Sequence, residues 1–146
     1  MNIEDLLSVQ DVVVDLRASG KTPLLQDLAE RAAKALAIDA HLIAAELLKR
    51  EGLGSTGVGH GIAIPHARLA EVQRPFGLIA RLKRPIDFEA IDGAPVDIVF
   101  LLLQPASSSS DLNALATVAR KLREPERLER MRTAADGEAL YRELTR

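Results

Sequence analysis

The side chains that could do chemistry gather in one short stretch in the middle of the chain, Gly54-Ser-Thr-Gly-Val-Gly-His-Gly-Ile-Ala-Ile-Pro-His66. Its four glycines allow positive φ angles and leave backbone N–H groups uncovered, so the stretch could form a nest for an anion. A plain flexible turn is the alternative. Neither common nucleotide pattern fits, because no Lys-Ser/Thr pair follows and no strand leads directly into a G-x-G-x-x-G turn. The candidate anion-binding residues are Gly54, Ser55, Thr56, Gly57, Gly59 and Gly61.

His66 is the last residue of this stretch, and the backbone just before it is restrained. Pro65 fixes the backbone just before it and biases Ile64 toward an extended shape. A neutral imidazole held rigidly beside backbone amides can act as a nucleophile toward phosphorus, while the amides hold the phosphoryl oxygens. The pattern therefore indicates a phosphohistidine site, with a purely structural histidine as the alternative.

The composition narrows the function classes. The chain has 146 residues, of which 47% are hydrophobic and 27% charged, as in ordinary globular proteins. An aromatic share of 3% and a net charge of -2 argue against nucleic-acid binding. The chain has no cysteine, which excludes disulfides, thiolate metal sites and cysteine nucleophiles. The histidines are His41, His60 and His66, and His41 is expected at the surface.

The amino terminus does not look like an export signal, because Met1–Gln10 carries acidic residues and lacks a basic start followed by an apolar run. The longest apolar run, Ile98–Leu103, is far too short to cross a bilayer. We expect a cytoplasmic protein without membrane insertion, folded as one domain over residues 1–146.

Strand and helix patterns alternate along the chain. Strands are expected at Asp11–Leu16, Ile62–Ile64, Phe76–Leu82 and Val96–Leu103. Helices are expected as a short lead-in at Ile3–Leu7, after a Thr22-Pro23 cap, between an Asp39 cap and Gly52, from Asp111 onward, and in two short pieces divided by Pro125 and Asp136-Gly137. Because Ile98–Leu103 is apolar at every position, both faces of that strand should be covered. The prediction is a three-layer α/β/α domain with a central mixed sheet.

The Gly54–His66 stretch resembles the phosphorylation motif of enzyme IIA of the fructose/mannitol class in the bacterial phosphoenolpyruvate-dependent phosphotransferase system, most of all its nitrogen-regulatory branch. The resemblance covers essentially the whole chain. It continues through Arg50-Glu51, Arg84–Val96, Ile98–Pro105, Leu112–Leu122 and Glu138–Tyr141.

The resemblance implies specific roles. His66 matches the phosphoacceptor, which takes a phosphoryl group at Nε2 from the phosphohistidine of a small phosphocarrier protein, itself charged by enzyme I. Arg50 matches the active-site arginine, and its permanent positive charge suits a phosphoryl group. It also suits a helix carboxyl end, and both roles can hold together. No cofactor or metal is implied, and the downstream partners are regulatory target proteins that the sequence does not identify.

The sequence departs from the family at one position. Members carry a second, helper histidine before the leucine that matches Leu112, and Asp111 stands there instead. An ionised Asp111 would repel a phosphoryl group, although it could orient the His66 ring. His60 could replace the helper or be an exposed loop residue. We expect the loop amides and Arg50 to suffice without either.

Other classes of function stay open at this point. A free-standing fructose- or mannitol-specific enzyme IIA would share the same motif. A metal-binding module could use His60 and His66 with a carboxylate such as Asp111, although the sequence shows neither a clear third ligand nor residues that would orient the histidines. A protein-binding descendant that has lost phosphorylation would also explain the missing histidine.

Overall fold

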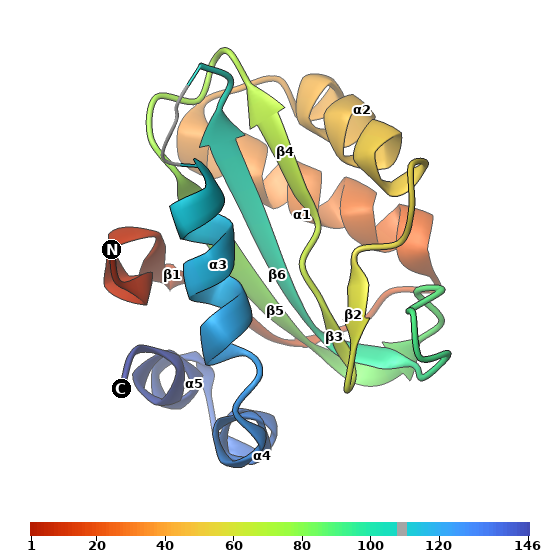
Figure 1. Cartoon of the computed structure of the whole chain (residues 1–146), viewed down its shortest axis with the longest axis vertical. Helices are drawn as coiled ribbons and strands as arrows, with labels where there is room; N and C mark the ends of the chain where they lie inside the picture. The colour runs from red at the N-terminus through yellow and green to blue at the C-terminus, as the bar shows by residue number, and fades with distance from the viewer. Residues whose placement is uncertain (108–110) are drawn as a thin grey trace.

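A computed structural model of the chain describes residues 1–107 and 111–146, with the side chains of the second segment described from Asn113 onward. The Asp111 side chain, and so its suggested auxiliary role, lies outside the described residues. The described chain forms one mixed sheet with helices on both faces (Figure 1). Its strands are β1 (Leu7–Leu16), β2 (Gly57–Gly59), β3 (Ile62–Ala63), β4 (His66–Leu69), β5 (Phe76–Ile86) and β6 (Val96–Pro105).

The sheet is built around β6, the apolar strand. β5 lies antiparallel to one side of it, and β1 lies parallel to β5. On the other side β3 and then β4 run parallel to β6, one after the other, and β2 pairs antiparallel with β3. The predicted mixed sheet is confirmed, and Ile98–Leu103 is fully buried as its all-apolar pattern required.

Helices on the two faces enclose two hydrophobic cores. The helices α1 (Lys21–Leu36) and α2 (Ala40–Glu51) cover one face. The short helix η1 (Ile3–Asp5) and the helices α3 (Asp111–Lys121), α4 (Pro125–Thr133) and α5 (Gly137–Thr145) cover the other. The three-layer arrangement is therefore as predicted. Within the described residues, no helix is both long and apolar enough to cross a membrane.

Local signals located the helix starts well where a side chain acts as the cap. Asp39 and Asp136 accept hydrogen bonds from the backbone N–H groups of His41 and Ala139. The first long helix instead starts at Lys21, after Gly20, so the expected Thr22 cap lies inside its first turn. Pro23 fits there because the first N–H groups of a helix have no partner within the helix.

Several strand predictions need correction, including β2, which was not expected, and β5, which extends beyond Leu82 to Ile86. β1 begins at Leu7 rather than Asp11, because Leu7 is buried against the sheet and pairs with Gly77, and the helical lead-in shrinks to Ile3–Asp5. β4 was not expected at all. The strand predicted at Ile62–Ile64 ends at Ala63, and after Pro65 the chain resumes pairing with β6 as a separate strand.

Candidate functional site

His66 opens β4 and lies on the face of the sheet that α3 covers. The neighbouring Ala67 and Leu69 belong to the core under α1 and α2. Since side chains alternate along a strand, His66 and Arg68 face the opposite way. His66 pairs in register with Leu102, which belongs to the core under α3. The half-buried imidazole thus sits between the edge of the sheet and α3.

The backbone fixes which ring nitrogen of His66 is available. Nδ1 lies 2.8 Å from the carbonyl oxygen of Ile64. A carbonyl only accepts hydrogen bonds, so Nδ1 carries the hydrogen and donates it. The lone pair is then left on Nε2. Pro65, between the two residues, stiffens this arrangement, and its carbonyl accepts a hydrogen bond from the Leu102 N–H at 3.0 Å.

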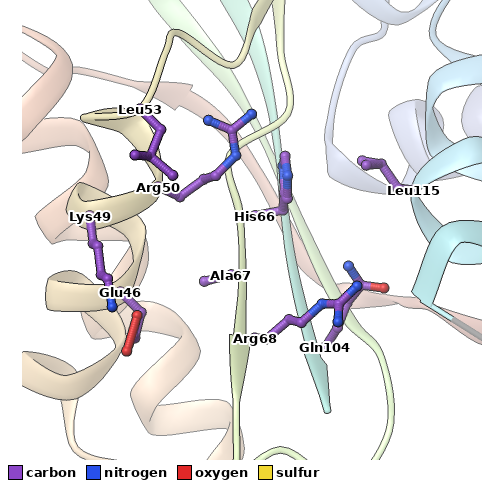
Figure 2. A pocket seen from close by; sticks show the side chains of 9 residues that line it. All are labelled: Glu46, Lys49, Arg50, Leu53, His66, Ala67, Arg68, Gln104 and Leu115. Atoms are coloured by element: carbon purple, nitrogen blue, oxygen red, sulfur yellow. The ribbon is translucent and has the colours of Figure 1, made fainter. Parts of the chain in front are cut away.

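His66 opens into a pocket of about 400 Å³ formed by α2, β4, β6 and α3 (Figure 2). Among the described residues, three cationic side chains line it, Lys49, Arg50 and Arg68, against one acidic side chain, Glu46. Leu53 and Leu115 supply apolar walls on two sides. A pocket with this lining suits a small anion next to an imidazole nitrogen.

Arg50 reaches this pocket from the last turn of α2, which packs against β4. Figure 2 shows its guanidinium extending over the same space as the His66 ring. Its Nη1 donates to the carbonyl oxygen of Gly54 at 2.9 Å, which holds the side chain in place. The fork of a guanidinium offers five N–H donors, so this single contact leaves others for an anion. The structure therefore brings together the two residues that sequence reasoning ranked first.

A buried charge cluster anchors the turn that holds Arg50. The Glu51 carboxylate accepts hydrogen bonds from the Thr56 backbone N–H at 3.2 Å and from the Thr56 hydroxyl. Lys21 Nζ lies 2.6 Å from the same carboxylate and 4.8 Å from the centre of the Phe88 ring. These contacts fix the turn after α2, and with it the Gly54 carbonyl.

The glycine-rich stretch is a β-hairpin rather than an open nest. β2 and β3 are joined by His60 and Gly61, whose φ angles of 58° and 79° define a type I′ turn. Gly57 is required by packing, because a Cβ there would lie 2.8 Å from the Ala90 Cβ. Arg132 holds the hairpin by donating to the His60 carbonyl at 2.7 Å and to Asp97 at 3.0 Å.

The amides expected to bind phosphate already have partners inside the protein. The Thr56 N–H donates to Glu51, the Gly57 N–H to Ser55 Oγ at 3.0 Å, and the His60 N–H to Asp92 at 3.0 Å. None of the six residues expected to form an anion nest lines the pocket of His66. The structure connects the stretch to the pocket through the Gly54 carbonyl, which accepts from Arg50. The spacing of Gly59, His60 and Gly61 is the signal for a hairpin turn.

His60 lies away from His66, in a groove of about 660 Å³ between the hairpin and α3. It is exposed, and its backbone N–H holds the pKa of Asp92 below the ordinary value, with the Ala94 N–H acting in the same direction. Within the described residues no group of three His, Cys, Asp or Glu side chains could hold a metal ion. The structure thus gives no support to a metal module among those residues.

Gln104 is one of the pocket residues that sequence reasoning missed, as it also missed Glu46, Lys49 and Arg68. It lies on β6, is 3% exposed, and lines the same pocket as His66. Its side-chain oxygen is buried without a hydrogen-bond partner in the described part of the chain. The available signal was a polar residue that directly follows the apolar run Ile98–Leu103.

Comparisons with known proteins define the class. The sequence pattern of the family described as "Phosphoenolpyruvate-dependent sugar phosphotransferase system, EIIA 2" matches residues 5–146. The chain belongs to this enzyme IIA family and is a component of the phosphotransferase-system type.

The relatives named nitrogen regulatory protein match more of this chain than the fructose-specific component does. A nitrogen regulatory protein of Bradyrhizobium diazoefficiens is 44% identical over 142 residues, which cover 97% of this chain and 93% of that protein. The crystal structure of nitrogen regulatory protein IIA-Ntr from Neisseria meningitidis superimposes with a TM-score of 0.92 at 31% identity, covering 98% of this chain and 99% of that one. A fructose-specific EIIA component of Haloferax volcanii is 42% identical over 104 residues, 70% of this chain and 66% of that protein.

Proposed function

We propose that this protein is a cytoplasmic phosphoryl carrier with regulatory output, which accepts a phosphoryl group on Nε2 of His66. The observation that carries the proposal is the hydrogen bond from His66 Nδ1 to the Ile64 carbonyl, in a pocket lined by Arg50 and Lys49. That bond leaves Nε2 as the nucleophilic nitrogen. The donor is the phosphohistidine of a small phosphocarrier protein, charged in turn by enzyme I from phosphoenolpyruvate.

The transfer step follows from the arrangement of the ring. The Nε2 lone pair forms a bond to phosphorus while the bond between phosphorus and the donor histidine nitrogen breaks, and that electron pair returns to the donor ring. The His66 ring gains positive charge and keeps its Nδ1 hydrogen, so its hydrogen bond to the Ile64 carbonyl strengthens. The carbonyl thus stabilises the product as well as orienting the nucleophile.

Arg50 acts on the phosphoryl group. A phosphorylated side chain carries a charge of about -1.5 to -2 at pH 7. Arg50 is already oriented by the Gly54 carbonyl, so little side-chain entropy is lost when its remaining N–H groups bind phosphoryl oxygens. Lys49, one residue earlier on α2, adds positive charge at the same wall of the pocket.

Intact-mass spectrometry tests the proposal directly. The protein is incubated with phosphoenolpyruvate, enzyme I and the cognate phosphocarrier protein. Wild type should gain one phosphoryl group, and His66→Ala should gain none. His41→Ala and His60→Ala serve as matched controls and should be labelled like wild type. Labelling of the His66→Ala protein, or absence of labelling in wild type, would refute the proposal.

A fructose-specific enzyme IIA is the second candidate, favoured by the similarity to the Haloferax volcanii component over part of the chain. A sugar-specific protein would pass its phosphoryl group to a sugar-specific enzyme IIB. We expect the phosphorylated protein to keep its label when it is mixed with fructose- or mannitol-specific enzyme IIB. Rapid loss of the label to that protein would favour the second candidate.

A further inference from the structure

Gln104 is buried in a way that folding alone does not explain. Its side chain is 3% exposed, and its oxygen has no hydrogen-bond partner in the described part of the chain. Buried polar side-chain atoms in native proteins are hydrogen-bonded in the large majority of cases, because an unpaired one destabilises the fold. The neighbours of Gln104 along β6 are the apolar Leu101, Leu102 and Leu103, so an apolar residue would suit this position better for stability alone.

The register of the sheet places Gln104 beside the phosphoacceptor. β4 and β6 are parallel, with His66 opposite Leu102 and Arg68 opposite Gln104. All four side chains therefore share the face under α3. Strand spacing and rise set the diagonal distance between the Cα atoms of His66 and Gln104 at about 8 Å. Both side chains line one pocket, and in the view of Figure 2 the Gln104 amide lies below Leu115 and overlaps the end of the Arg68 side chain.

We propose that Gln104 is a phosphoryl-binding residue, whose carboxamide donates a hydrogen bond to the phosphoryl group on His66 Nε2. This inference rests on the proposed function. A carboxamide carries two N–H donors and no charge, so it can bind a phosphoryl oxygen without adding repulsion. Because no described residue donates to its oxygen, a half-turn about the last side-chain torsion breaks no described hydrogen bond at that atom and places the NH₂ group there, where it can donate to a phosphoryl oxygen.

The loop amides first expected to bind the phosphoryl group do not supply this donor. The loop amides at Thr56, Gly57 and His60 are bonded within the protein. Arg50 approaches from α2, whereas Gln104 lies on β6, so the two reach the pocket from different elements. A phosphoryl group on Nε2 has three oxygens that need donors. Gln104 supplies a donor that neither the glycine-rich stretch nor His60 provides.

Gln104→Leu and Gln104→Met test this role. Both variants remove the donor and keep an apolar side chain of similar size. The initial rate of transfer from the phosphorylated phosphocarrier to His66 should fall by about 10²-fold, the lower end of the cost of one lost donor. The melting temperature should stay equal or rise, because the unpaired oxygen is removed. Gln10→Leu is the matched control, since it makes the same substitution at an exposed position outside the His66 pocket, and its rate should stay within a few-fold of wild type.

A measurement on the unmodified protein supplements the variants. In wild type labelled with ¹⁵N, phosphorylation should shift the side-chain NH₂ resonances of Gln104, while those of the distant Gln10 should not move. Unchanged Gln104 resonances, or Gln104 variants that transfer at the wild-type rate, would overturn the inference while His66 phosphorylation stands. A variant with a lowered melting temperature and a normal rate would show a structural role and overturn it as well. Failure of wild type to be phosphorylated would instead overturn the proposed function.

Discussion

Replacing Glu51 tests whether the buried cluster behind the pocket holds the turn that positions Arg50. The Glu51 carboxylate pairs with Lys21 at 2.6 Å and accepts two hydrogen bonds from Thr56. Its side chain is 5% exposed and that of Lys21 is 15% exposed. Water can therefore replace little of the ion pairing and hydrogen bonding that Glu51→Ala removes. Removing one partner of a buried ion pair costs about 3–5 kcal/mol. Glu89, at 3.6 Å from Lys21, keeps part of the pairing, although its own side chain is 77% exposed.

The lower end of that range, about 3 kcal/mol, is therefore expected for Glu51→Ala. For a chain of this size each kcal/mol lowers the melting temperature by about 2–4 °C, which gives a fall of about 6–12 °C. Thermal and urea unfolding followed by circular dichroism measure both quantities. Asp27→Ala is the control, because Asp27 forms an exposed ion pair with Arg31 one turn along α1, worth about 0.3–0.5 kcal/mol. A loss in Glu51→Ala no larger than in Asp27→Ala would refute the assignment of the cluster as a structural anchor.

Three further predictions concern the site and the hairpin. Arg50→Ala should slow phosphoryl transfer by at least tenfold and lower stability by only about 0.3–1 kcal/mol, since the residue lies at a helix end; a large stability loss with normal transfer would show a structural role. His60→Asn should leave the transfer rate within a few-fold of wild type, because His60 lies outside the His66 pocket and asparagine before Gly61 suits a type I′ turn; a hundredfold loss would identify His60 as the substitute helper. The N–H groups of His60 and Ala94 lower the pKa of Asp92 below 3.8 in the folded protein, so the contribution of its ionised carboxylate is present above that pH and lost as the pH falls below it. The chemical shift of the His60 amide should follow this change in wild type and not in Asp92→Asn.

The parts of the fold that depend on local chemistry could be predicted from the sequence. The caps at Asp39 and Asp136 involve hydrogen bonds to residues two or three positions away, and the all-apolar run of β6 by itself indicates burial on both faces. β4 could not be predicted in the same way. Its residues pair with β6, more than thirty positions along the chain, and Pro65 interrupts the local strand pattern. Pairing at that distance leaves no local periodicity in four residues.

The same distinction separates the site residues. The restraint on His66 was predictable because it comes from the adjacent Ile64-Pro65, and the structure shows it as the hydrogen bond to the Ile64 carbonyl. The glycine-rich stretch was misleading because glycine density fits an anion nest and a tight hairpin equally well. Only tertiary partners decide between them, and here Glu51 and Asp92 take the amides at Thr56 and His60.

The hydrogen bonds of those amides bear on how the site could work with Asp111 in place of the second histidine. The sequence suggested that loop amides and Arg50 could replace it. The structure leaves Arg50 near His66 but binds the loop amides elsewhere, so further donors must come from side chains of the pocket. Gln104 is the neutral candidate, and because no described residue donates to its oxygen, we expect leucine at this position to give an equally or more stable fold. Such a cost is expected where a residue is kept for binding a transient group, because in the proposed role an amide N–H turned to the position of that oxygen finds its acceptor only while His66 is phosphorylated.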